Sequence, residues 1–164
     1  MIGTFIKSTA PQSEGQCYRI KSLLGKQRGR RTFLAEETQT KTLVVLKLIL
    51  FGPDFTWEDL KLFEREAETL KSLKHAAIPQ YLTSFEAETQ IGKGFVLVQT
   101  YIEATSLQQQ VSAGRRFSEP DLKEIARSVL AILTYLHSQH PPVVHRDIKP
   151  SNLLLTDRTA HSCG

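Results

Sequence analysis

The residues of this chain that are best suited to do chemistry together lie between Val144 and Leu154. The segment reads Val144-His145-Arg146-Asp147-Ile148-Lys149-Pro150-Ser151-Asn152-Leu153-Leu154. A carboxylate can accept a proton, an ammonium group can offset negative charge, and carboxylate and amide oxygens are ligands that Mg²⁺ prefers. Asp147, Lys149 and Asn152 are therefore candidates for one reactive site. A match with this fixed polar spacing is more specific than a short glycine pattern.

The segments that precede this site must position it, and they carry strand and helix patterns in turn. Runs of alternating or continuous apolar residues predict strands at residues 18–24, 31–36, 42–50, 81–87 and 94–101. Residues 57–73 carry apolar side chains every three or four positions, which predicts an amphipathic helix. The predicted order is three strands, one helix and two further strands.

Two more helices are predicted between these strands and the candidate site. A short helix is expected at residues 106–113 and a long one at residues 119–138. Ser118 is expected to cap the long helix and Pro120 to lie in its first turn. The apolar residues expected to form its buried face are Leu122, Ile125, Ala126, Val129, Ile132, Leu133 and Leu136. Residues 1–16 show no periodicity and are expected to form a loose lead-in.

Composition excludes several classes of protein. The chain has 164 residues, 40% of them apolar and 23% charged, as in ordinary globular proteins, and it has no apolar run long enough to span a membrane. Cys17 and Cys163 form no disulfide framework, which is typical of a cytoplasmic protein. The net charge is +4, but only residues 26–31 form a concentrated basic patch, and no aromatic residue is interleaved with it. We therefore expect no nucleic-acid partner.

Together these features resemble the amino-terminal part of a serine/threonine protein kinase domain, particularly that of bacterial and cyanobacterial members. The segments 31–36 (RTFLAE) and 62–67 (LFEREA) suggest this branch. The resemblance implies an α+β fold with a five-stranded antiparallel sheet and one helix in the amino-terminal lobe, residues 17–101. Residues 102–164 would then begin the carboxyl-terminal lobe, with its first helices and the catalytic loop. The implied ligands are ATP and Mg²⁺, and the implied partner is a protein substrate.

The resemblance also implies roles for individual polar residues. Asp147 corresponds to the catalytic Asp and Lys149 to the Lys beside the transferred phosphoryl group, while Asn152 corresponds to a metal ligand. Lys47 corresponds to the lysine that binds the α- and β-phosphates, and Glu66 to its partner. Glu64 and Glu68 are the alternatives to Glu66. His145 would be structural, and Arg146 would meet a phosphorylated activation loop.

The adenine site is implied by the same resemblance. Its walls would be Leu24, Thr32, Val45 and Leu154. Gln99 would stand at the gatekeeper position, and Thr100 and Ile102 would offer backbone hydrogen bonds to the base.

The phosphate loop departs from the family pattern G-x-G-x-x-G-x-V. Gly25 matches its first glycine, but Gln27 and Arg30 stand at the second and third, and Thr32 replaces the Val. Glycines allow backbone N–H groups to approach phosphates closely. We therefore expect weak nucleotide binding. The arginines of the turn, at positions 28, 30 and 31, either bind phosphate by charge or form a solvated basic turn, which we favour.

The residues after Asn152 contain no D-F-G, the metal-binding motif of the family. Asp157 precedes Arg158-Thr159 and does not fit that motif. We therefore expect a truncated, incomplete kinase domain at residues 17–164 that is inactive by itself, with a partner chain as one way to complete the carboxyl-terminal lobe. The alternative is a non-catalytic, pseudokinase-like binding or scaffold module.

Overall fold

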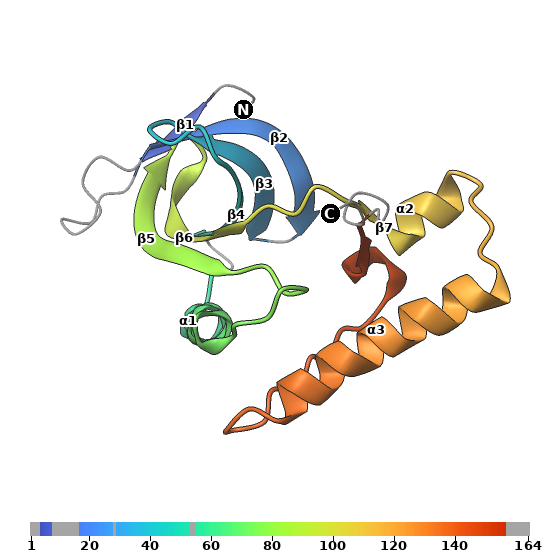
Figure 1. The fold of residues 1–164 in the computed structure, drawn as a ribbon. Coiled ribbons are helices and arrows are strands. Elements are labelled where there is room, and N and C mark those ends of the chain that lie inside the picture. The colour runs from blue at the N-terminus through green and yellow to red at the C-terminus, as the bar shows by residue number, and fades with distance from the viewer. Residues whose placement is uncertain (1–3, 8–16, 28, 53–54, 157–164) are drawn as a thin grey trace. The chain divides into compact units, whose positions relative to one another are not determined.

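The structure is a computed structural model that describes residues 4–7, 17–27, 29–52 and 55–156 (Figure 1). It divides into two compact units, residues 1–101 and residues 102–164, and each is described by itself. Asp157 and Cys163 lie outside the described residues. Among the described residues, no helix combines the length and the apolar character needed to span a membrane.

The first unit is built on a six-stranded antiparallel sheet with one helix. Its strands lie in the order β1-β2-β3-β4-β6-β5, so that β6 pairs with β4 and β5 lies at one edge. The strands are β1 (Phe5–Lys7), β2 (Cys17–Gln27), β3 (Arg30–Glu37), β4 (Leu43–Leu50), β5 (Tyr81–Thr89) and β6 (Gly92–Thr100). The predicted α+β class is confirmed. The predicted succession of three strands, a helix and two strands corresponds to β2, β3, β4, α1, β5 and β6.

The sheet has one strand more than predicted, because part of the expected lead-in is ordered. Phe5–Lys7 pairs with β2, and the backbone N–H of Ile20 donates to the carbonyl oxygen of Thr4 over 2.9 Å. Ile6 is fully buried in the core of the sheet. A three-residue strand with one inward side chain is too short to show an alternating pattern, which is why the sequence did not indicate it.

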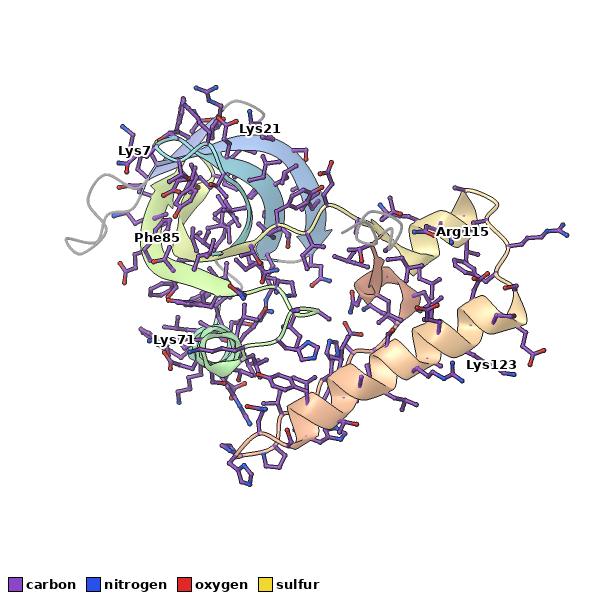
Figure 2. The ribbon with its side chains drawn as sticks, in the orientation of Figure 1. Lys7, Lys21, Lys71, Phe85, Arg115 and Lys123 are labelled. Atoms are coloured by element: carbon purple, nitrogen blue, oxygen red, sulfur yellow. The ribbon has the colours of Figure 1, made fainter. Side chains whose placement is uncertain are left out.

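The sheet is strongly curved and encloses most of the apolar core on its inner face (Figure 1). The rings of Tyr18 on β2 and Phe85 on β5 (labelled in Figure 2) stack with centroids 5.8 Å apart, so strands far apart in the sheet order share one core. Burial, with the charge of Glu37 nearby as a second cause, raises the pKa of Tyr18 to about 12. The inner-face cluster comprises Ile6, Tyr18, Ile20, Phe33, Ala35, Val44, Leu46, Leu48, Phe85, Ala87, Val96 and Val98.

Helix α1 (Trp57–Ser72) packs on the other face of the sheet. It begins with a capping box, in which the Thr56 hydroxyl accepts from the Asp59 N–H and the Asp59 carboxylate accepts from the Thr56 N–H. Phe63 and Ala67, four residues apart on one helix face, are buried in a cluster with Ile49 and Leu97 of the sheet. The apolar period of the sequence thus predicted both the helix and the face that it buries.

The second unit contains β7 (Thr105–Ser106), α2 (Leu107–Ser112), α3 (Glu119–His137), a 3₁₀ turn (Pro150–Asn152) and β8 (Leu154–Leu155). The predicted start of α3 is confirmed, since Ser118 forms a capping box with Asp121 and Pro120 lies in the first turn. The prediction that seven apolar residues of α3 form a buried face is wrong. Of these seven residues, only Leu136 is fully buried, and Leu122 is 52% exposed. Within the second unit, no other described helix or strand packs extensively along α3, so the unit itself covers the apolar face of this helix only in part.

Candidate functional site

Lys47 lies in the middle of β4, a strand that is buried on both sides. Its neighbours Leu46 and Leu48 point into the inner core, so by strand alternation Lys47 lies on the outer face with Val45 and Ile49. In the strand register Lys47 stands opposite Thr32 on β3 and Leu97 on β6. This outer face is also the one that packs against α1.

Glu66 is the acidic residue that α1 directs to Lys47. The Lys47 Nζ donates to the Glu66 Oε1 over 2.6 Å, and the two side chains are 36% and 37% exposed. Glu66 precedes the buried Ala67 and follows the buried Phe63 by three residues, so it lies beside the packed face of the helix. Glu64 and Glu68, the alternatives, are exposed. The structure therefore shows the predicted Lys47–Glu66 pair.

Two other predicted site residues adjoin Lys47 on the same face. Gly25 of β2 stands opposite Thr32, and Thr32 stands opposite Lys47, so the three form a row across adjacent strands. A Cβ atom at Gly25 would lie 3.8 Å from the Thr32 Cβ, which is ordinary van der Waals contact. Leu24 lies at a register shift between β2 and β3 and is half-exposed.

The turn between β2 and β3 replaces the glycine-rich loop of the family pattern. Gly29 has a φ of 68°, a left-handed conformation that glycine adopts without strain. The Arg31 guanidinium donates to the carbonyl oxygens of Gln27 and Arg30 over 2.8 and 2.9 Å. Arg31 therefore holds the turn itself, which favours the interpretation of a solvated basic turn for this residue. Residue 28 lies outside the described residues.

The end of β6 carries the residues predicted to contact the base. Gln99 stands opposite Val45, and both are 9% exposed. The backbone N–H of Thr100 donates to the carbonyl oxygen of Gln80 over 2.9 Å, and the Gln80 N–H donates to the Thr100 hydroxyl over 2.9 Å. The Thr100 N–H is therefore already used within the protein, and the prediction that it donates to a base does not hold in this structure. Sequence reasoning missed Gln80, because nothing in its type or spacing signals a partner twenty residues away.

In the second unit, Asp147, Lys149 and Asn152 come together in the turn before β8. The Lys149 Nζ lies 2.9 Å from the Asp147 Oδ2. The Asn152 side-chain amide donates to the same Oδ2 and to the Asp147 backbone carbonyl oxygen, each over 2.9 Å. Of the two remaining predicted residues in this unit, Leu154 pairs with Ser106 in the β7–β8 ladder, and Ile102 is half-buried at the start of the unit.

Local contacts keep the Asp147 carboxylate charged and positioned. The hydrogen bond from Lys149, followed by that from Asn152, holds the pKa of Asp147 below its usual range. The Asp147 N–H lies 3.3 Å from the His145 Nδ1, which accepts from it. Arg146 has a φ of 62°, an uncommon left-handed conformation for a residue with a side chain. An ionised carboxylate on such a turn can accept a hydrogen bond from a hydroxyl group and orient it, although its lowered pKa makes it a weaker base.

The Asn152 side chain is also suited to supply one ligand of a magnesium site. Both Asn152 side-chain donors go to Asp147, so the Asn152 Oδ1 is the oxygen left to act as a ligand. Mg²⁺ in proteins commonly takes one or two side-chain oxygens together with phosphate oxygens and water. In the part of the chain that the structure describes, no cluster of three or more His, Cys, Asp or Glu residues could hold a metal ion. Asn152 thus fits as one ligand of a metal site, and the other ligands would have to come from elsewhere.

Comparison with known proteins agrees with this chemistry. Residues 18–161 match the protein kinase domain family. Serine/threonine-protein kinase B of Synechocystis sp. is 43% identical over 95 residues, which are 57% of this chain and 16% of that protein. Serine/threonine-protein kinase C of the same organism is 33% identical over 147 residues, 85% of this chain and 26% of that protein. PknA of Nostoc sp. is 32% identical over 148 residues, 86% of this chain and 25% of that protein.

The family match covers nearly all of the strands and helices described above, and the three relatives are cyanobacterial serine/threonine kinases. The predicted resemblance, including its cyanobacterial branch, is thereby confirmed. The chain spans between 16% and 26% of the length of these relatives. This chain belongs to the protein kinase family.

Proposed function

We propose that this chain carries the ATP-binding and hydroxyl-activating groups of a cytoplasmic serine/threonine protein kinase. The observation that carries the proposal is the Lys47–Glu66 pair at 2.6 Å, formed between a central strand and the helix that packs on it. Both side chains are partly exposed, so the ammonium group is held in place and still accessible to a phosphate. A fixed lysine charge of this kind is what binding of the α- and β-phosphates requires.

The outer face around Lys47 would receive the rest of the nucleotide. Val45 and Thr32 lie beside Lys47 in the strand register and would contact the adenine ring together with Leu24. The carbonyl of Thr100 would accept a hydrogen bond from the base. Gly25, opposite Thr32, leaves room where a larger side chain would stand. Because Gln27 and Arg30 replace two glycines of the phosphate loop, we propose that affinity depends mainly on Lys47 and is weak.

The turn with Asp147 would act on the acceptor hydroxyl. Asp147 would accept the proton of a substrate Ser or Thr, while Lys149 would offset charge on the transferred phosphoryl group. Asn152 would hold Mg²⁺, which when bound neutralises charge on the β- and γ-phosphates. Lys149 is already paired with Asp147, which supports an arrangement in which the two groups act next to each other.

Titration calorimetry with Mg-ATP tests the binding half of the proposal. We expect wild-type protein to bind weakly and Lys47→Met to lose on the order of tenfold or more in affinity, since a charge-assisted phosphate contact contributes roughly 1.5–3 kcal/mol. Glu66→Gln should lose less, because the lysine charge remains. Equal heats for wild type and Lys47→Met would refute the proposed role of the pair.

A radiolabelled-ATP assay with a generic protein substrate tests the transfer half. Residues 1–164 supply Asn152 but no D-F-G carboxylate, and phosphoryl transfer depends on well-fixed metal charge. We therefore expect this polypeptide alone to transfer phosphate at least about a thousandfold more slowly than kinases typically do. Robust labelling that Asp147→Ala abolishes would contradict this expectation and would indicate that a second chain completes the site.

A second candidate function is a non-catalytic, pseudokinase-like binding module. The observation that favours it is the apolar surface of α3, on which Leu122 and Leu130 are 52% and 61% exposed. Exposed apolar surface of this kind is typical of interaction sites. Failure of wild-type protein to bind Mg-ATP in the calorimetry above would favour this candidate over the first.

A further inference from the structure

A row of basic and apolar side chains crosses the outer face of the sheet where β1 pairs with β2. Phe5 of β1 stands opposite Arg19 of β2. Arg19 in turn stands opposite Glu36 of β3, which stands opposite Leu43 of β4. A strand neighbour of each of these residues belongs to the inner-face cluster, so by strand alternation the row lies on the outer face. Helix α1 packs on this face at Ile49, which is six residues further along β4.

Four cations lie on or beside this row, together with the carboxylate of Glu36. Lys7 ends β1 on the same side as the row, and the Lys21 Nζ lies 2.8 Å from the Glu36 Oε2 (both lysines are labelled in Figure 2). The hydrogen bond from Lys21, followed by the charges of Lys21, Arg19 and Lys41, holds the pKa of Glu36 below its usual range. Glu36 therefore lies among several cations and neutralises only one of them.

Three of these cations form no ion pair with any residue that the structure describes. Lys21 is paired with Glu36, whereas Lys7, Lys41 and Arg19 have no carboxylate within ion-pair distance among the described residues. The Arg19 guanidinium lies 5.4 Å from the centroid of the Phe5 ring, a cation–π contact that orients the group without neutralising it. Three positive charges at this end of the sheet are thus available to an anionic partner.

The row also exposes apolar side chains at both of its ends. Phe5 is 46% exposed and Leu43 is 40% exposed, and they stand three strand spacings apart, roughly 14 Å. The curved sheet encloses its core on the inner face, so this outer face is convex (Figure 1). A convex face of this composition suits a layer of lipid headgroups, into which apolar side chains insert while Lys and Arg reach the phosphates. An extended peptide binds instead in a groove or along a strand edge.

We propose that this basic outer patch binds the headgroup layer of an anionic membrane surface. The patch comprises Phe5, Lys7, Arg19, Lys21, Lys41 and Leu43. Clusters of Lys and Arg are drawn to the negative potential of such a surface. The inference goes beyond the proposed function and does not depend on it, because none of these residues belongs to the proposed nucleotide site. Binding through the patch would hold the first unit at an anionic leaflet.

Flotation of the whole chain with lipid vesicles tests the proposal. One set of vesicles contains equal parts of phosphatidylglycerol and phosphatidylcholine, and the other contains phosphatidylcholine alone. We expect the protein to float with the anionic vesicles only, and the bound fraction to fall as salt is added, because salt screens exposed charges. Equal binding to the two kinds of vesicle, or none to either, would overturn the proposal.

A charge-matched pair of triple variants assigns the binding to the patch. The patch variant combines Lys7→Gln, Arg19→Gln and Lys41→Gln. The control combines Gln at the exposed lysines 61, 71 and 93 of the same unit, so the two variants have the same net charge. Each cation near an anionic surface contributes roughly a fivefold factor to binding, so the patch variant should bind about a hundredfold more weakly and the control clearly less so. Equal losses would overturn the proposal, since net charge alone would explain them.

Phe5→Gln separates a membrane from an acidic polypeptide and leaves every cation in place. Nearly half of the ring is exposed and would leave water on insertion, so vesicle binding should weaken on the order of tenfold. Binding of soluble poly-glutamate should not change. Vesicle binding that Phe5→Gln leaves intact, or tight poly-glutamate binding through the same cations without vesicle binding, would overturn the proposal in favour of an acidic polypeptide. Circular dichroism of each variant confirms that it is folded.

Discussion

The two polar clusters of this chain are built in different ways. Lys47 and Glu66 are separated by 19 residues and meet because a strand and a helix pack against each other. Asp147, Lys149 and Asn152 lie within six consecutive residues and are held by hydrogen bonds inside one turn. The surroundings differ as well: the sheet of the first unit encloses a fully buried core, whereas α3 of the second unit has a single fully covered side chain.

The difference indicates what each cluster depends on. The Lys47–Glu66 distance depends on the packing of Phe63 and Ala67 against the sheet, so loss of the core should separate the pair. The Asp147 cluster depends on short-range backbone geometry, so it should tolerate loosening elsewhere. Tertiary packing therefore supports the Lys47–Glu66 pair, and local sequence supports the turn that carries Asp147.

Substitutions in the two units should differ most in their effect on stability. Phe33→Ala removes a fully buried ring from the sheet and should lower the free energy of unfolding by about 3–5 kcal/mol. Leu122→Ala on α3 should lower it by less than about 1 kcal/mol, because half of that side chain is already in water. Urea denaturation followed by circular dichroism measures both. Equal losses at the two positions would contradict the contrast in packing.

The first strand offers a sharper test within the sheet. Ile6→Ala should lower the free energy of unfolding by about 2–4 kcal/mol, since Ile6 is fully buried in the inner core although it belongs to a strand of three residues. Phe5→Ala is the control on the outward side, where the ring is 46% exposed and lies under the Arg19 guanidinium. Its loss should be clearly smaller. An Ile6→Ala protein as stable as wild type would show that β1 does not contribute to the core.

The smallest effect expected is a change in the titration of Asp147. Lys149→Met removes the main cause that holds the pKa of Asp147 below its usual range, so the pKa should rise toward that range. As the pH falls through the lowered pKa, Asp147 gains a proton and its contact with Lys149 is lost, so any stabilisation from this pair is present at neutral pH and lost in acid.

Carboxyl chemical shifts followed by NMR across an acid titration measure this change. Asp121 is the matched control, because Ser118 and not a lysine is the first cause that lowers its pKa. The Asp121 titration should be the same in wild type and Lys149→Met. An unchanged Asp147 titration in the variant would show that the Lys149 contact does not persist in solution.

Several features could be predicted from the sequence because their signals are local. The helical period predicted the helix at residues 57–73, while the choice of Glu66 over Glu64 and Glu68 came from the resemblance to the kinase family. The cap of α3 followed from the residue types at Ser118 and Pro120. Features that join distant residues were not predictable in this way. Gln80 holds Thr100 across twenty residues, and β1 has a single inward side chain to indicate it.

The sequence by itself determined the periodicity of the elements, the caps and the spacing of Asp147, Lys149 and Asn152, since each of these depends on residues within one or two turns of the chain. Only the tertiary structure decided that Lys47 and Glu66 lie 2.6 Å apart, that Ile6 belongs to the core and that the Gln99 amide lies buried next to Val45. The physical reason is that strand register and helix packing depend on the free energy of burying whole faces at once. No single segment contains that information.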